Sequence, residues 1–249
     1  MSTILRCYSC TSLHSYYLTC RLVCSLSTDM KVLAILSQKG GAGKTTLALH
    51  LAVEAERLGL TTAVIDLDPQ ASAASWGDSR QQETPAVVSA QPSRLNQVLA
   101  AARDGGARLA IIDTAPHSES AALAAAREAD FILIPCRPAI LDLRAISHTI
   151  DLARIVAKPV AVVLNTVPSR GSLTNEALDA LDGYDVIVCP ESLGQRSSFI
   201  HSLTAGLAAQ EYEPQGKAAR EVERLMQWTL TQLGLKNEQQ KAKPVRRAS

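Results

Sequence analysis

The fold is decided by one stretch, residues 31–59, which reads KVLAILSQKGGAGKTTLALHLAVEAERLG. It opens with a continuous apolar run, Val32–Leu36, typical of a strand that is covered on both faces. Three glycines follow within residues 40–43, and an Ala/Leu-rich segment predicted to be helical over 44–58 comes next. This order of strand, glycine-rich turn and helix predicts a phosphate-binding loop. The N–H groups of such a turn converge on an anion, and the helix dipole adds a favourable potential.

The rest of the chain repeats the alternation of short apolar runs and longer helical segments. The further predicted strands are Thr62–Ile65, Ala86–Val88, Leu109–Ile112, Phe131–Ile134, Val160–Leu164 and Val186–Val188. The further predicted helices cover 94–103, 118–127, 141–156, 173–182, 197–208 and 216–234. Right-handed crossovers between such strands give an α/β fold, a doubly wound and mainly parallel sheet flanked by helices.

Composition sets the limits of the fold. The chain has 249 residues, of which 47% are hydrophobic and 20% charged, enough for a sizeable core. No apolar run reaches the ~18 residues of a membrane span, and no stable membrane association is expected. We predict one domain over 30–235, preceded by 1–29 and followed by a basic, disordered tail over 236–249. The tail carries a net charge of +4 and residues 1–29 carry +1, so the +1 of the whole chain leaves −4 for the domain.

Residues 1–29 differ in kind from the rest, because they hold four of the six cysteines: Cys7, Cys10, Cys20 and Cys24. Two interpretations are open. The cysteine pairs favour a metal site and a metallocluster carrier, although the nine residues between the pairs are fewer than zinc sites usually have. Alternatively the segment is a disordered leader or an upstream-translated extension, with Met30 as the start of the fold. We expect the second.

The glycine-rich turn predicts the chemistry of the site. Its expected nucleotide-binding residues are Lys39, Gly40, Gly41, Ala42, Gly43, Lys44, Thr45 and Thr46. Lys44 is expected to reach the β- and γ-phosphates of ATP, Thr45 to supply a hydroxyl to Mg²⁺, and Thr46 to donate to the α-phosphate. The first glycine of the usual phosphate-loop pattern is replaced by Gln38, and a second lysine, Lys39, stands next to it.

Three aspartates follow predicted strands. Asp66 and Asp68 follow Thr62–Ile65, and Asp113 follows Leu109–Ile112. The carboxyl edge of an open α/β sheet is where ligands bind. Four apolar residues before Asp113 indicate a Mg²⁺-binding carboxylate, as in other phosphate-loop NTPases. Asp66 and Asp68 could also simply cap the helix that follows.

The loop K-G-G-x-G-K-T-T with its extra lysine resembles the deviant Walker A ATPases, which include ParA-type partition proteins, MinD-like proteins and the nitrogenase iron protein. The resemblance covers about residues 31–235 and implies that Lys39 crosses an ATP-sandwiched homodimer to the partner's nucleotide. It also implies that Asp68 orients the attacking water and that Asp66 lies near the metal shell. Residues 113–120 would be a switch segment, in which we expect His117 to face solvent.

Other segments resemble the small ParA-type partition ATPases of that family: Asp68-Pro69-Gln70, Trp76, Arg196-Ser-Ser-Phe199, Gly206, Glu211-Tyr-Glu-Pro214 and Gly216-Lys-Ala-Ala219. The resemblance implies that Asn165 and Pro190 meet the adenine. It places DNA-contacting basic residues at Arg196, Lys217 and Arg220.

The resemblance implies a Mg²⁺-dependent ATP hydrolase, weak alone, in plasmid or chromosome partition. Its ATP-bound dimer would bind nonspecific DNA, and a small centromere-binding, ParB-like activator would stimulate hydrolysis and release it. Its location would be cytoplasmic and nucleoid-associated. A MinD-like membrane-surface ATPase stays as an alternative, because the apolar stripe of the last helix could be a membrane anchor or could pack on the domain.

Overall fold

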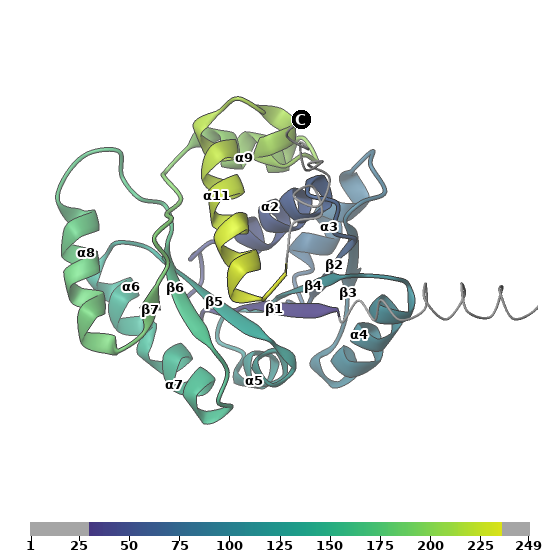
Figure 1. Cartoon of the computed structure of the whole chain (residues 1–249), viewed down its shortest axis with the longest axis horizontal. Coiled ribbons are helices and arrows are strands. Elements are labelled where there is room, and N and C mark those ends of the chain that lie inside the picture. The colour runs from purple at the N-terminus through teal and green to yellow at the C-terminus, as the bar shows by residue number, and fades with distance from the viewer. Residues whose placement is uncertain (1–29, 236–249) are drawn as a thin grey trace, which may run out of the picture.

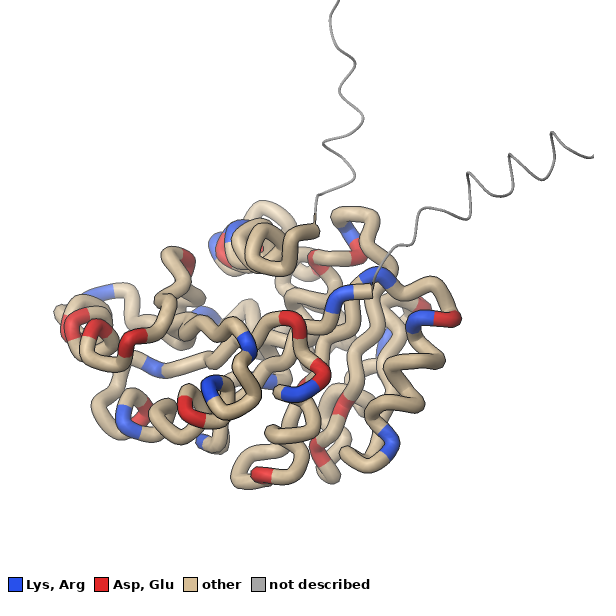
Figure 2. The backbone as a smooth tube through the Cα atoms, turned by 60° about the horizontal axis from the view of Figure 1, so that its bottom comes forward, with Lys and Arg blue, Asp and Glu red and all other residues tan. Residues whose placement is uncertain are grey.

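The structure is a computed structural model, and it describes residues 30–235. The predictions of a leader over 1–29, of a metal site among its cysteines and of a basic tail over 236–249 lie outside the described residues. Figure 1 shows a central sheet with helices on both faces, and Figure 2 shows acidic and basic residues spread over its helices and loops.

Over residues 30–235 one parallel sheet has the strand order β3-β2-β4-β1-β5-β6-β7. The strands are β1 (Lys31–Ile35), β2 (Thr62–Asp66), β3 (Ala86–Ser89), β4 (Leu109–Asp113), β5 (Phe131–Cys136), β6 (Val160–Leu164) and β7 (Ile187–Val188). The chain crosses from one half of the sheet to the other between β4 and β5, which lie on either side of β1. The prediction of a doubly wound parallel sheet is confirmed.

The strands are apolar throughout because helices cover both faces of the sheet. On β1, Leu33 and Ile35 belong to one core cluster, and Val32 and Ala34 belong to the other. Successive side chains of a strand point to opposite faces. The first layer consists of α2 (Lys44–Arg57), α3 (Ser72–Ser79), α9 (Ser197–Thr204), α10 (Ala209–Tyr212) and α11 (Lys217–Gln232). The second consists of α4 (Leu95–Asp104), α5 (Glu119–Glu128), α6 (Ile140–Ala145), α7 (Ser147–Ile155) and α8 (Leu173–Leu181).

Helices α3 and α10 were not predicted, and one predicted helix is divided into two. Helix α3 is short and contains Gly77, so it lacks a full helical repeat of apolar residues. The predicted helix over 141–156 is divided at Ile146 into α6 and α7. The two pieces contact different neighbours, since α6 packs on α8 and α7 packs on α5. Periodicity within one segment could not show a division that depends on distant partners.

The apolar stripe of helix α11 is buried. The side chains of Val222, Leu225, Met226, Thr229 and Leu233 are buried, and the helix packs on α2. The stripe therefore belongs to the core, which favours the second of its two interpretations, packing on the domain. No helix within residues 30–235 is both long and apolar enough to cross a membrane.

A buried histidine joins α2 to α9. The Nδ1 atom of His50 lies 2.7 Å from the Thr46 carbonyl oxygen, so Nδ1 carries a proton and donates it. The ring meets Phe199 edge-on, with centroids 5.0 Å apart. Burial lowers the pKa of His50 to about 4, although the Thr46 carbonyl and Glu211 favour the charged ring. His50 is therefore neutral in the folded protein near pH 7.

This burial predicts a pH-dependent loss of stability. A histidine in the unfolded chain titrates near 6.5, so the contribution of neutral His50 is complete above that pH and is lost as pH falls toward about 4. Between pH 7 and pH 5 the free energy of unfolding should fall in both proteins. The fall should be about 2 kcal/mol larger in the wild type than in a His50→Gln variant. Urea unfolding at both pH values measures the difference. Equal losses in the two proteins would contradict the assignment.

Candidate nucleotide-binding site

The glycine-rich turn lies where β1 ends and α2 begins. Gly43 caps α2 in a left-handed conformation with φ of 91°, and Gly41 has φ of 73°. Side chains other than glycine are disfavoured at these angles. The turn leaves the first N–H groups of α2 without intrahelical partners at the positive end of the helix dipole. The turn therefore presents backbone N–H groups at the start of α2, and the binding of a phosphate there stays a prediction.

Lys44 is buried beneath this turn, with 6% of its surface exposed. Its Nζ donates to the Lys39 carbonyl over 3.4 Å. Burial lowers the pKa of Lys44, and the charges of Asp113 and Asp68 oppose the effect. Lys44, Asp68 and Asp113 thus form one electrostatic cluster, and their predicted roles at a nucleotide stay predictions.

Asp113 ends β4, opposite Ile35 of β1 and Asp66 of β2. Its side chain is fully buried, and among the described residues neither carboxylate oxygen has a hydrogen-bond partner. Burial raises the pKa of Asp113 to about 7, although the nearby Thr45 hydroxyl lowers it without making a hydrogen bond of ordinary geometry. A buried carboxylate without partners is costly unless a cation completes it. With the Thr45 hydroxyl beside it, this oxygen donor set fits Mg²⁺.

The other two aspartates, Asp66 and Asp68, accept hydrogen bonds from different backbone N–H groups. Both oxygens of Asp66 accept backbone N–H groups: Oδ1 from Asp68 at 2.9 Å, and Oδ2 from Ala73 at 2.9 Å and from Ala74 at 3.2 Å. Asp66 thus holds the start of α3, and its predicted role near the metal stays a prediction. Asp68 is half-buried, and its Oδ1 accepts the N–H of Gln70 at 2.9 Å.

Lys39, the second lysine of the turn, forms an ion pair with Asp142 of α6. The Asp142 side chain is only 10% exposed, whereas that of Lys39 is 36% exposed. The pair points Lys39 toward a carboxylate of its own chain. The sequence did not predict this partner, since the two residues are 103 positions apart.

The predicted switch segment is hydrogen-bonded to β1 and to the turn. The hydroxyl of Thr114 donates to the Ile35 carbonyl at 3.0 Å, and the N–H of His117 donates to the Gln38 carbonyl at 3.2 Å. His117 has φ of 55°, a left-handed conformation that is uncommon outside glycine. Its side chain is exposed, which confirms the expected solvent-facing histidine.

A cavity of about 320 Å³ opens beside the turn. Gly41, Gly43 and Thr46 line one part of it, and residues 193–196 with Phe199 and Ile200 line another. Asn165 also lines it, but its Nδ2 donates to the Ala42 carbonyl at 2.8 Å and its Oδ1 accepts the N–H of Thr166 at 2.8 Å. The polar atoms of Asn165 therefore support the turn and the loop after β6.

Pro190, the other residue predicted to meet adenine, does not line this cavity, whereas Leu193 and Gly194 do. Phe199 was noted in the sequence only as part of the segment Arg196-Ser-Ser-Phe199, which resembles partition ATPases. The sequence around these residues does not indicate that they lie beside the turn. The loop after β7 is brought to the turn only by the order of the strands in the sheet.

The three predicted DNA-contacting residues lie in different surroundings. Arg196 lines the cavity, and its guanidinium is paired with Glu221 of α11. The side chain of Arg196 is 27% exposed. Lys217 and Arg220 are exposed in the first turns of α11. Arg196 therefore has an ion-pair partner, whereas Lys217 and Arg220 have none among residues 30–235.

A parallel α/β sheet with a glycine-rich turn, a buried lysine and a strand-end aspartate defines a phosphate-loop nucleotide-binding protein. Residues 33–202 match the family described as the CobQ/CobB/MinD/ParA nucleotide binding domain, and the chain belongs to this family. The predicted membership of the ParA/MinD superfamily is confirmed.

Relatives and solved structures agree with this assignment. The chain is 36% identical to maintenance of carboxysome distribution protein A of Gloeobacter kilaueensis over 158 residues, 62% of this chain and 70% of that protein. It is 27% identical to protein IncC of Escherichia coli over 259 aligned positions, 82% of this chain and 70% of that protein. Its fold is similar to the ATP complex of Cyanothece McdA, with a TM-score of 0.65, 16% identity, and 83% and 97% of the two chains covered. It is similar to Pyrococcus horikoshii MinD with Mg-ADP, with a TM-score of 0.66, 18% identity, and 80% and 96% covered.

The close approach of Asn165 to the turn predicts a specific penalty at Gly43. A Cβ atom added there would lie 2.2 Å from Asn165 Nδ2, whereas one added at Gly59 (φ of 83°) would meet nothing within 4 Å. Gly59→Ala should cost about 1–2 kcal/mol of unfolding free energy from backbone strain alone. Gly43→Ala should cost clearly more, and adding Asn165→Ala should recover the excess. Urea unfolding measures all three. Equal costs at the two glycines would contradict the packing described.

Proposed function

We propose that this protein is a Mg²⁺-dependent ATP hydrolase of the ParA type, which dimerises around ATP and partitions DNA or positions another cargo. The observation that carries the proposal is the buried carboxylate of Asp113, which has no partner among the described residues and faces Lys44 under an anion-binding turn. Family membership supports a nucleotide as the anion.

The proposed reaction uses residues that the structure brings together. The turn and Lys44 would hold the phosphate chain, with Thr46 beside it. Thr45 and Asp113 would hold Mg²⁺, which neutralises charge that develops on the transferred phosphoryl group. Asp68, half-buried in the same electrostatic cluster, would orient the attacking water. Positioning and charge stabilisation are what phosphoryl transfer requires, and a strong base is not needed.

The proposed dimer rests on the position of Lys39. In the single chain its ammonium is neutralised by Asp142. To reach the nucleotide of a second copy, Lys39 would have to leave that carboxylate for a more highly charged anion. ATP would thus bind the two copies together, because two loops that each carry two lysines repel one another unless a polyanion separates them. The ATP complex reported for Cyanothece McdA supports ATP as that anion.

The cargo has two candidates. Relatives include a chromosome partitioning protein ParA of Myxococcus xanthus, which supports DNA partition. Others are named for carboxysome distribution, which supports the positioning of a protein-based cargo. A partner protein that stimulates hydrolysis, ParB-like in the first case, belongs to either version.

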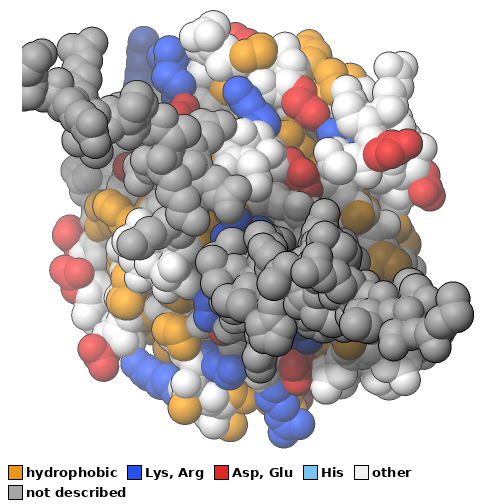
Figure 3. Space-filling view, turned by 45° about the vertical axis from the view of Figure 1, so that its right-hand side comes forward, with side chains coloured by type: hydrophobic (Ala, Val, Ile, Leu, Met, Phe, Trp, Pro, Cys, Tyr) orange, Lys and Arg blue, Asp and Glu red, His pale blue; other side chains and the backbone are white. Residues whose placement is uncertain are grey.

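Contact with nonspecific DNA is proposed at Lys217 and Arg220, both exposed at the start of α11. Figure 3 shows the basic side chains of one face scattered among acidic and neutral ones. A face with mixed charges can make only weak, salt-sensitive contact with phosphates, through its basic side chains. The MinD-like alternative loses one support, since the apolar stripe of α11 is buried against α2.

Removing the resting partner of Lys39 should promote dimerisation. Asp142→Asn keeps the shape but not the charge, so the single-chain state loses a charge-assisted hydrogen bond. We expect half-maximal dimerisation at a roughly tenfold lower ATP concentration than in the wild type. Light scattering with Mg²⁺ and ATP measures it. Asp151→Asn, which changes an exposed aspartate of α7, is the matched control. An unchanged ATP dependence in Asp142→Asn would contradict the proposed release of Lys39.

The function itself is tested by a gel shift on nonspecific DNA. The wild type should shift DNA with ATP and Mg²⁺ but not with ADP. Asp68→Ala should bind ATP without hydrolysing it and should therefore keep DNA shifted for longer. Lys217→Gln with Arg220→Gln should weaken the shift about uniformly across sequences. A shift that is independent of nucleotide would contradict an ATP-controlled DNA-binding dimer.

A further inference from the structure

One arginine beside the turn has no counter-charge in the part of the chain that the structure describes. Arg137 lies in the loop that follows β5, and its side chain is exposed. Within residues 30–235 it makes neither an ion pair nor a side-chain hydrogen bond, and it therefore differs from Arg196 across the same cavity, which is paired with Glu221. A guanidinium is always charged in proteins.

The guanidinium of Arg137 lies directly over the phosphate-binding turn. A Cβ atom added at Gly41 would be 3.4 Å from its Nη2 and 3.9 Å from its Cζ. Arg137 also lines the cavity together with Gly41, Gly43 and Thr46. The side chain therefore reaches the part of the cavity nearest the start of α2.

The backbone that carries Arg137 is well positioned for this reach. Cys136 before it ends a buried strand, and Pro138 after it is buried. The Arg137 carbonyl accepts the N–H of Ala139 at 2.8 Å. Strand β5 pairs with β1, which leads into the turn. Arg137 is thus fixed to the same sheet edge as the turn that it covers.

The charges around the turn leave Arg137 as the cation in need of a partner. Lys39 is paired with Asp142, and Lys44 faces Asp113 and Asp68. Nothing comparable faces Arg137 among the described residues. The planar guanidinium of an arginine beside backbone N–H groups at a helix N-terminus can donate two hydrogen bonds to the oxygens of one phosphate.

We propose that Arg137 is a nucleotide-binding residue, whose guanidinium contacts the phosphate chain of the nucleotide bound in its own subunit. The inference rests on the proposed function, because it requires a nucleotide in this cavity. It adds a third cation to the two lysines of the turn, supplied by a different strand. Because an arginine fork can donate two hydrogen bonds to one phosphate, lysine should replace it only in part.

The test is the affinity of the full chain for ADP and for ATP, measured by calorimetry with Mg²⁺. ADP is the informative ligand, because a contact within one subunit does not require dimerisation. Arg137→Gln should lower the affinity for both nucleotides about tenfold, the effect of losing one charge-assisted hydrogen bond. Arg137→Lys should lie between this variant and the wild type.

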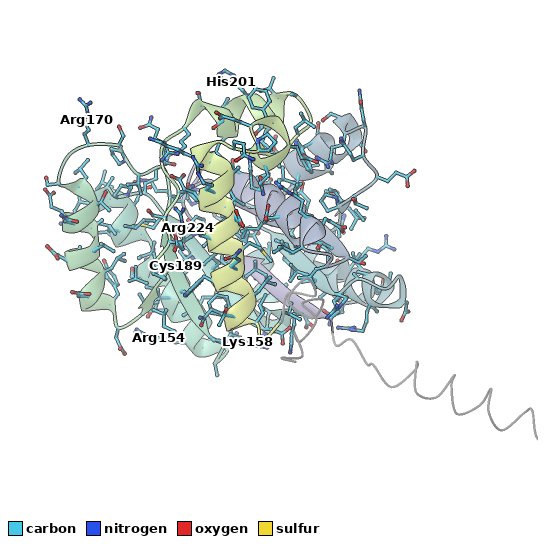
Figure 4. All side chains as sticks on the ribbon, turned by 45° about the horizontal axis from the view of Figure 1, so that its top comes forward. Arg154, Lys158, Arg170, Cys189, His201 and Arg224 are labelled. Carbon is cyan, nitrogen blue, oxygen red and sulfur yellow. The ribbon has the colours of Figure 1, made fainter. Side chains whose placement is uncertain are left out.

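Arg170→Gln is the matched control, since Arg170 is an exposed arginine without a described partner and projects from the loop before α8, as Figure 4 shows. It should leave both affinities within about twofold of the wild type. Thermal melts confirm folding, which an exposed substitution should not disturb.

A loss of ADP affinity smaller than about fivefold in Arg137→Gln would overturn the proposal. So would a variant in which only ATP-dependent dimerisation changes, because that result places the contact on the partner's nucleotide. If the wild type bound neither ADP nor ATP, the result would contradict the proposed function itself and not only the role of Arg137.

Discussion

The structure depends on one electrostatic arrangement: a buried lysine and a buried carboxylate facing each other under a turn of backbone N–H groups. Lys44 and Asp113 are both almost wholly removed from water, and burial disfavours the charge of each. Among the described residues the Asp113 oxygens have no hydrogen-bond partner, and Lys44 Nζ donates to the Lys39 carbonyl over 3.4 Å. A polyanion with a divalent cation would supply what both lack. The adjacency of β1 and β4 brings these two residues together, since the turn that carries Lys44 follows β1 and Asp113 ends β4.

Much of this could be predicted from the sequence because its signals are local. The turn, its lysines and the aspartates at strand ends each follow an apolar run within a few residues, and the carboxyl ends of parallel strands meet at one edge. What could not be predicted depends on contacts between distant segments. Examples are the pairing of Lys39 with Asp142, that of Arg196 with Glu221, and the position of Arg137 over Gly41. Asn165 shows the same limit: it was predicted to meet the adenine, but not to donate a hydrogen bond from its amide to the turn.

Several residues in the segments that resemble small partition ATPases hold the fold together, among them Trp76, Gly206 and Glu211. The Arg80 guanidinium lies 4.5 Å from the Trp76 ring, pairs with Glu211, and donates to the Gly206 carbonyl at 3.1 Å. A Cβ atom on Gly206 would lie 2.8 Å from the Ser79 carbonyl oxygen. These contacts fasten α3, and with it the loop that carries Asp68, to the segment between α9 and α10. The resemblance in this region therefore reflects how the Asp68 loop is held, and it need not report the identity of the cargo.

The central claim is that ATP draws Lys39 from its own chain to a second copy. The most direct measurement is a crystal structure of Asp68→Ala with Mg²⁺ and ATP, read at one atom, the Nζ of Lys39. We expect two copies face to face, with each Lys39 Nζ within hydrogen-bond distance of a phosphate oxygen of the nucleotide in the other copy. An ATP-bound protein in which Lys39 stays paired with Asp142 of its own chain would contradict it.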